Sequence, residues 1–202
     1  MSIDRRLSVL ADDQPVAQDR EGHMRLTGHH TQTLYPDLFL LYCWNLQDRD
    51  YWRLKNSKFL TVSHGETLLA CGEIVNLTRE TVKEGSLVTV SFALGFSFWN
   101  RFVSLEVPAG TSACDTVKQL LEAAGSEFQL LVWPENNVIF TRPQAFHGKV
   151  HEAISSVLSA CEAVPYLIQA GIAIREKTDT PIDIYIDMDT VSGPWDHIQM
   201  ID

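Results

Sequence analysis

The chain has 202 residues, 45% of them hydrophobic, which is enough for one domain or for two smaller domains with cores of their own. Its 26 acidic and 16 basic residues give a formal net charge of -10, which repels nucleic-acid phosphates, so we do not expect a protein that binds DNA or RNA. No stretch approaches the roughly 20 apolar residues that span a bilayer, and the N-terminus lacks the apolar core of a signal peptide, so we expect neither membrane insertion nor a cleaved export signal.

The first 33 residues show no sustained hydrophobic period. They include Asp12-Asp13-Gln14-Pro15 and Gly28-His29-His30, which are sequences typical of turns and irregular structure. We therefore expect residues 1–33 to be an N-terminal arm that becomes ordered only against a neighbouring subunit. The folded body is expected to start near Leu34.

Residues 34–107 carry one strand signal after another. A short apolar run predicts a strand over Leu38–Tyr42, and connections of hairpin length that contain glycine follow it. The strands expected beside these connections are Phe59–Ser63, Thr67–Cys71, Gly72–Thr81 and Leu87–Leu94. Several short strands at this spacing predict a small antiparallel β-barrel or sandwich domain over residues 34–107.

The hydrophobic period changes after Pro108. Thr111 and Ser112, followed by Asp115, have the spacing of a helix N-cap, and Gly125 supplies the residue type at which helices stop. Apolar residues between them recur at the period of a helix. The sequence therefore predicts an amphipathic helix between Ser112 and Gly125.

A second amphipathic helix is expected from Val150 to Cys161, because Pro165 cannot continue it. Two hairpins are expected around this helix. Their strands are Gln129–Trp133 with Val138–Arg142, and Tyr166–Gln169 with Ile172–Arg175. Residues 108–202 are thus predicted to form a mixed domain with two amphipathic helices and hairpins, and the whole chain is assigned to the α+β class.

The strongest candidate for chemistry is the segment from Asp183 to Asp189. Strand alternation places Asp183, Tyr185, Asp187 and Asp189 on one face, where clustered carboxylates could serve acid and base catalysis or hold a hard cation. A small carbohydrate-active enzyme or a glycan-binding module using the Asp183, Asp187 and Asp189 face is therefore the alternative function. A solvated strand face explains the same pattern more simply.

Other chemical patterns are weaker. His29 and His30 are adjacent, and His147 and His151 are four residues apart, but no further ligand stands at the spacing of a metal site. The four cysteines show no paired C-x-x-C spacing, so we expect reduced thiols. Nucleophile-elbow and phosphate-binding glycine motifs are missing from the sequence. We predict no catalytic residue, no cofactor and no bound metal, and hence no enzyme.

Aromatic residues are the most suggestive feature, because Trp, Tyr and Phe often anchor protein interfaces. Several lie at the ends of predicted strands, although core packing explains most of them equally well. The residues that we select as interface candidates are Trp44, Trp52, Trp99, Phe102 and Trp195.

The order of several short motifs is informative. They are Tyr35-Pro36-Asp37, Val62-Ser63-His64-Gly65, Cys71-Gly72-Glu73-Ile74, Phe98-Trp99-Asn100, Val107-Pro108-Ala109-Gly110-Thr111-Ser112 and Phe146-His147-Gly148-Lys149-Val150. In this order, over about residues 35 to 192, the sequence resembles the N-terminal portion of phage tail baseplate hub proteins. The resemblance is to the late control protein D type of hub, found in contractile tails and related injection machines.

The resemblance implies a structural protein of the virion tail baseplate, made in the host cytoplasm, that joins the tail tube to the spike or tip. The implied partners are further copies of the chain in a ring, with a trimer as the expected assembly, the tail tube protein and the spike or tip protein. Hub proteins are usually longer and carry a second barrel, whereas this sequence stops at Asp202. We therefore expect another chain to supply the missing barrels, or a ring that is built differently.

Overall fold

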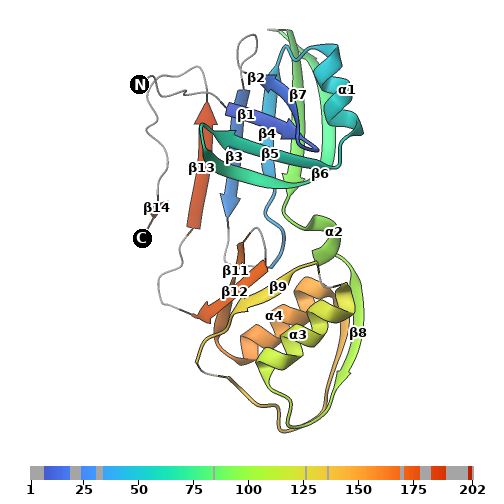
Figure 1. The fold of residues 1–202 in the computed structure, drawn as a ribbon, viewed down its shortest axis with the longest axis vertical. Coiled ribbons are helices and arrows are strands. Elements are labelled where there is room, and N and C mark those ends of the chain that lie inside the picture. The colour runs from blue at the N-terminus through green and yellow to red at the C-terminus, as the bar shows by residue number, and fades with distance from the viewer. Residues whose placement is uncertain are drawn as a thin grey trace. The chain divides into compact units, whose positions relative to one another are not determined.

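The computed structural model describes residues 7–18, 24–30, 34–83, 85–125, 127–135, 137–168, 171–177, 183–189 and 200–201. They form two compact units, which Figure 1 shows as ribbons. The sheet unit consists of the described residues within 1–31, 37–96 and 183–201, and the helical unit of those within 32–36 and 97–182. The chain thus enters the helical unit near residue 97 and not at the expected boundary near residue 108, because the strand after residue 101 pairs within the helical unit.

The sheet unit contains helix α1 (Asp48–Asn56) and nine strands among the described residues. The strands are β1 (Leu7–Ala11), β2 (Gln14–Gln18), β3 (Met24–His30), β4 (Phe39–Trp44), β5 (Phe59–His64), β6 (Thr67–Val82), β7 (Gly85–Ala93), β13 (Asp183–Asp189) and β14 (Met200–Ile201). Their order is β14-β13-β3-β4-β7-β6-β5-β1-β2, and neighbouring strands are antiparallel. The sheet is open in the described residues, so of the two expected forms, barrel or sandwich, the closed barrel is not found.

Strand β6 folds this sheet onto itself. Its first part, Thr67–Glu73, pairs with β5, and its second part, Glu73–Val82, pairs with β7 with a register shift between Ile74 and Asn76. The sequence predicts two strands here, Thr67–Cys71 and Gly72–Thr81, whereas the structure has one continuous strand. A Cβ atom on Gly72 would lie 2.2 Å from the carbonyl carbon of Ala93, so only glycine allows this close approach of two backbones.

One hydrophobic core lies between the two halves of the folded sheet. It contains buried residues of β1, β5 and β6 together with residues of β3, β4 and β7. Representative members are Val9, Leu60, Val62, Leu26, Leu41, Val88 and Val90, each at most 1% exposed. The core is therefore that of a sandwich whose two layers share β6.

The N-terminal segment supplies part of this core, which corrects the expected arm over residues 1–33. β1 pairs with β5 on one side and β2 on the other, and its residues Leu7, Val9 and Ala11 are buried. Asp12 and Asp13 both have positive φ, as the two-residue turn of a hairpin requires. The Asp12 carboxylate also accepts the backbone N–H of Phe59 at 2.9 Å. In β1 the apolar Leu10 stands between Val9 and Ala11 and interrupts the alternation of apolar and polar residues that indicates a strand.

Helix α2 (Phe96–Trp99) leads into the helical unit, which holds two further helices and two small sheets in its described residues. Its elements are β8 (Phe102–Val107), α3 (Ala113–Ala124), β9 (Gln129–Val132), β10 (Gln144–Lys149), α4 (Val150–Ala160), β11 (Ala163–Ile168) and β12 (Gly171–Glu176). The sheets have the orders β10-β8 and β11-β12-β9. Helices α3 and α4 pack against both sheets, so they form the middle layer.

Both predicted helices are confirmed. α3 has Ser112 as its N-cap and Gly125, at φ 121°, as its C-cap. The predicted hairpin of β11 and β12 is confirmed as well. The predicted hairpin of Gln129–Trp133 with Val138–Arg142 is wrong, because β9 pairs in parallel with β12. The segment Val138–Arg142 instead lies against the start of α3, where the Ala113 N–H donates to the Val138 carbonyl at 2.8 Å.

An aromatic cluster forms part of the core of the helical unit. The rings of Phe98, Trp99 and Phe128 lie with their centroids 5.0 Å apart in each pair. The Arg101 guanidinium covers Phe98 at 5.5 Å and donates to the Ala124 carbonyl at 2.8 Å, at the C-terminal end of α3. Arg101 thus donates a hydrogen bond to a carbonyl at the end of α3 and also covers one ring of the aromatic cluster.

Candidate assembly surfaces

The acidic segment from Asp183 to Asp189 is a strand, as predicted. It forms β13 and pairs with β3, from Ile184 opposite His30 to Asp189 opposite Arg25. The side chains of β13 lie outside the described part of the structure, so its proposed carboxylate face stays a prediction. Where side chains are described, no group of three His, Cys, Asp or Glu residues could hold a metal ion.

The histidine pair of the helical unit is divided between two elements. His147 lies on β10 opposite Ser104 of β8, and the Ser104 Oγ is 2.8 Å from its Nδ1. His151 lies on α4, where its ring packs against Tyr35. The two imidazoles therefore do not share a helical face, as a metal site at this spacing would require. His29 and His30 belong to β3, and their side chains are not described.

The structure separates the interface candidates into different environments. Trp52 and Phe102 are 53% and 74% exposed, so both can contact another protein. Trp44 is half-buried beside Tyr42. Trp99 is fully buried in the aromatic cluster, so it is not an exposed residue that could contact a partner. Trp195 lies outside the described residues.

An aromatic and cationic patch covers α1 and the adjoining part of β6. The Trp52 ring meets the Tyr51 ring edge to face, with centroids 5.6 Å apart. The Lys55 ammonium lies 4.7 Å from the Trp52 centroid, and the Arg79 guanidinium lies 5.0 Å from the Tyr51 centroid. Arg79 also pairs with Asp48 at 2.6 Å. We call these five residues the α1 patch.

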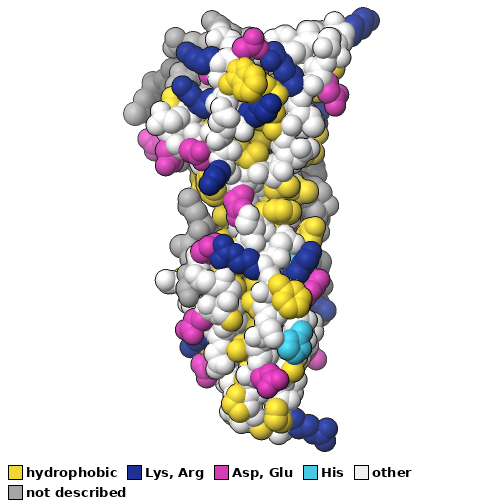
Figure 2. Space-filling model, turned by 90° about the vertical axis from the view of Figure 1, so that its right-hand side faces the viewer, with side chains coloured by type: hydrophobic (Ala, Val, Ile, Leu, Met, Phe, Trp, Pro, Cys, Tyr) yellow, Lys and Arg dark blue, Asp and Glu magenta, His cyan; other side chains and the backbone are white. Residues whose placement is uncertain are grey.

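Helix α1 is fixed to the sheet on its other side. Leu54 is fully buried in the sheet core, and Arg53 donates to the carbonyl of Pro15 on the end strand β2. Asp50 is 4% exposed and accepts from Arg49 Nε at 3.1 Å. Figure 2 shows a hydrophobic side chain ringed by Lys and Arg side chains on this side of the sheet unit. The α1 patch is thus held on an anchored helix, although its largest apolar side chain faces solvent.

A hollow of about 320 Å³ lies between α3 and β9. It is lined by Lys118, Leu121, Glu122, Phe128, Gln129 and Leu130. Leu121 and Phe128 are 3% and 8% exposed and form an apolar floor, whereas Glu122 is exposed. Leu131 and Val132 continue β9 with half-exposed side chains. We call this hollow the α3–β9 groove.

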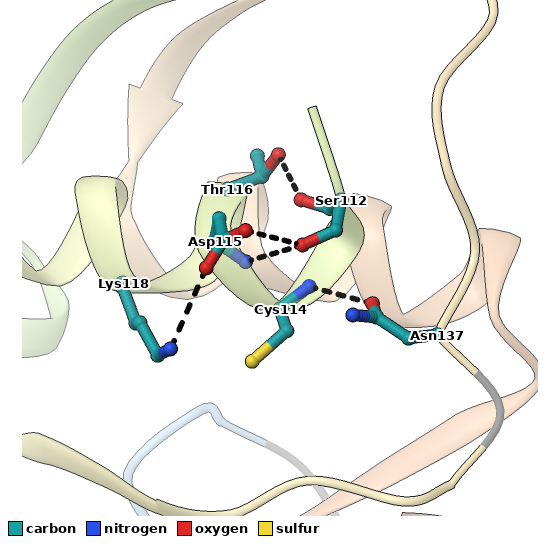
Figure 3. A network of polar contacts seen from close by, with 6 residues as sticks. All are labelled: Ser112, Cys114, Asp115, Thr116, Lys118 and Asn137. Carbon is teal, nitrogen blue, oxygen red and sulfur yellow. Dashed lines mark hydrogen bonds and ion pairs between the residues drawn. The ribbon is translucent and has the colours of Figure 1, made fainter. Parts of the chain in front are cut away.

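A polar network fixes the first turn of α3 (Figure 3). Ser112 Oγ accepts from the Asp115 N–H at 3.1 Å and donates to the Asp115 carboxylate at 2.7 Å. This hydrogen bond, with a smaller effect of Lys118, lowers the pKa of Asp115. Lys118 Nζ lies 3.4 Å from Asp115, and Asn137 accepts from the Cys114 N–H at 3.1 Å. Lys118, which lines the groove, is therefore drawn towards Asp115.

Comparison with known proteins was informative for the fold alone. No protein-family model and no curated protein sequence matches the chain. Among solved structures, a tail protein from Neisseria meningitidis MC58 matches with a TM-score of 0.63 and 15% identity, over 84% of this chain and 49% of that one. The 43 kDa tail protein of prophage MuSo2 from Shewanella oneidensis matches with a TM-score of 0.63 and 11% identity, over 87% and 56%.

The chain has the fold of phage tail proteins. The resemblance predicted from the order of sequence motifs is therefore confirmed at the level of the fold. An E. coli component of the type VI secretion system, described as similar to the T4 tail proteins gp27 and gp5, also matches, with a TM-score of 0.50 and 9% identity, over 83% of this chain and 47% of that one. The chain spans about half the length of these tail proteins. In its described residues, no helix is both long and apolar enough to cross a membrane.

Proposed function

We propose that the chain is a structural component of a phage tail baseplate hub and joins the tail tube to the spike or tip. The observation that carries this proposal is the tail-protein fold, which extends over 84% and 87% of the chain in two comparisons. The similar fold of a type VI secretion component supports the same class of assembly. Exposed Trp52 and Phe102 are residue types suited to contacts between subunits.

The proposed partners are further copies of the chain in a ring, with three as the expected number, together with the tail tube protein and the spike or tip protein. The proposed place is the virion tail. A net charge of -10 suits a ring around a DNA channel, because acidic walls discourage the passing DNA from binding.

Reconstitution with tail proteins of the same phage or prophage tests the function. We expect the purified chain to elute together with the tube and spike proteins in size-exclusion chromatography, with a mass by light scattering above that of each separate chain. A tube protein from an unrelated phage is the control and should elute separately. A chain that stays monomeric and leaves both tail proteins in their own peaks would refute the proposal.

Phe102 offers a sharper version of this test, because it is the most exposed of the large hydrophobic side chains described. Phe102→Ala should weaken binding to the tube or spike protein and leave the free energy of unfolding within about 0.5 kcal/mol, as for other surface substitutions. The matched control is Ile139→Ala, at a side chain that is 61% exposed. Equal loss of binding in both variants would show that Phe102 has no special role.

A further inference from the structure

The α1 patch presents an exposed indole beside a cation, and the α3–β9 groove is a hollow with a carboxylate in its lining. We propose that the α1 patch of one copy binds in the α3–β9 groove of a second copy, with the Trp52 indole in the hollow and Lys55 beside Glu122. This contact rests on the proposed function and deepens it, because it names the surfaces through which copies of the chain meet.

The projecting half of the contact is Trp52. Trp52 is 53% exposed, and the Tyr51 ring and the Lys55 ammonium lie against its indole. Trp, Tyr and Arg are the residue types that most often dominate binding energies, because they bury a large area at low entropic cost. Because Leu54 anchors α1 in the core of the sheet unit, the Trp52 indole is held at the surface, where it can contact another protein.

The receiving half is the hollow beside β9. A volume of about 320 Å³ is at the lower end of ligand-pocket sizes and suits one aromatic side chain. Leu121, Phe128 and Leu130 supply its apolar lining beside the edge strand β9. An inserted indole would therefore cover apolar surface that water now contacts.

Charge favours a second copy over other occupants. Residues 48–58 hold four cations, Arg49, Arg53, Lys55 and Lys58, and only two carboxylates, in a chain whose net charge is -10. A cationic patch on an acidic molecule is attracted to the acidic remainder of another copy. Lys118, which lines the groove, is drawn to Asp115, whereas Glu122 is exposed on α3 and can meet Lys55.

The contact is heterologous, because the patch and the groove are different surfaces. Each copy that offers its groove to one neighbour keeps its α1 patch for the next. Such contacts produce rings when the rotation between copies closes and filaments when it does not. The two surfaces thus allow repeated assembly from one kind of interface.

Sedimentation velocity of the full chain over a range of concentrations tests the contact. We expect self-association that weakens between about 50 mM and about 500 mM NaCl, because salt screens the Lys55 and Glu122 pair. Trp52→Ala should raise the dissociation constant roughly 30-fold, which corresponds to the loss of about 2 kcal/mol at an interface anchor. Glu122→Lys should also weaken association, and Lys55→Glu combined with Glu122→Lys should restore part of it.

Ile139→Ala and Lys177→Glu are the matched controls, since they remove an exposed apolar side chain and reverse an exposed charge at residues that belong neither to the α1 patch nor to the lining of the groove. Circular dichroism must show that every variant keeps the parental fold. A parent that is monomeric at all concentrations, or Trp52→Ala and Glu122→Lys variants that associate like the parent, would overturn the inference. So would a Trp52-dependent affinity for single-stranded DNA in a chain that does not self-associate. Joint elution with tail tube and spike proteins would still support the proposed function in these cases.

Discussion

The imidazole of His151 and the phenol ring of Tyr35 meet edge to face, with centroids 5.4 Å apart and planes at 84°. Among the described residues, the buried Nε2 atom of His151 has no hydrogen-bond partner. Burial, the largest cause, lowers the pKa of His151, Lys149 acts in the same direction, and Glu152 opposes them. The contact joins α4 to the segment at residues 34–36, which belongs to the helical unit.

We predict that this pair makes the protein sensitive to mild acid. Because the pKa of His151 is lower in the folded state than its ordinary 6.5, its contribution to stability is present above pH 6.5 and is lost as the pH falls through the folded-state value. His151→Phe keeps the ring contact and does not titrate. Its melting temperature should fall less than the parent's between about pH 7.5 and about pH 5.

At about pH 7.5, the same variant should gain about 1 kcal/mol, because it removes a buried nitrogen without a partner. His147→Phe is the control, since His147 is exposed. Identical pH dependence of the melting temperature in the parent and His151→Phe would contradict the assignment.

Removal of residues 1–18 should unfold the sheet unit. Leu7, Val9 and Ala11 are 1% exposed and Val16 is 2% exposed. Burial of each larger side chain contributes roughly 1.5–3 kcal/mol, so their combined loss approaches the whole stability of a domain. Near-ultraviolet circular dichroism should show loss of tertiary structure. A shorter deletion that stops before Leu7 is the control, and a natively folded chain without β1 and β2 would restore the expectation of a dispensable arm.

Gly72→Ala should destabilise the protein by about 1–3 kcal/mol, the usual cost of an overpacked site. The added Cβ would meet the backbone of Ala93, which cannot turn away as a flexible side chain can. Urea denaturation measures the loss. Asn76→Ala, at an exposed position of the same strand, should change stability by less than about 0.5 kcal/mol. Comparable effects of the two substitutions would mean that the two backbones are not in close contact.

Ser112→Ala should cost about 1 kcal/mol, because the first turn of α3 loses its N-cap. Ser112→Asn supplies another side-chain oxygen for the Asp115 N–H and should retain most of the stability. Thermal unfolding of the two variants compares them directly. An equal loss in both would show that the capping hydrogen bond contributes little.

The predicted elements that the structure confirms are those whose signals are local. α3 could be located because a capping serine, a helical period and a stop glycine all lie within its own segment. The hairpin of β11 and β12 could be located because its turn and both strands are adjacent in sequence. α1 was missed, since its N-cap Gln47 makes no side-chain cap and only Asp50 and Leu54 are buried. Among the candidate interface residues, exposure separated Trp52 from Trp99, which sequence could not do.

The sequence by itself determined the α+β class, the helix from Ser112 to Gly125 and the likeness to tail proteins, because local propensities and the order of motifs carry this information. Only the tertiary structure decided that β1 completes the sheet core beside β5, that β9 pairs in parallel with β12, and that Trp52 faces solvent while Trp99 is buried. Each of these depends on residues far apart in the chain. Their pairing is set by burial across the whole unit, which no single segment encodes.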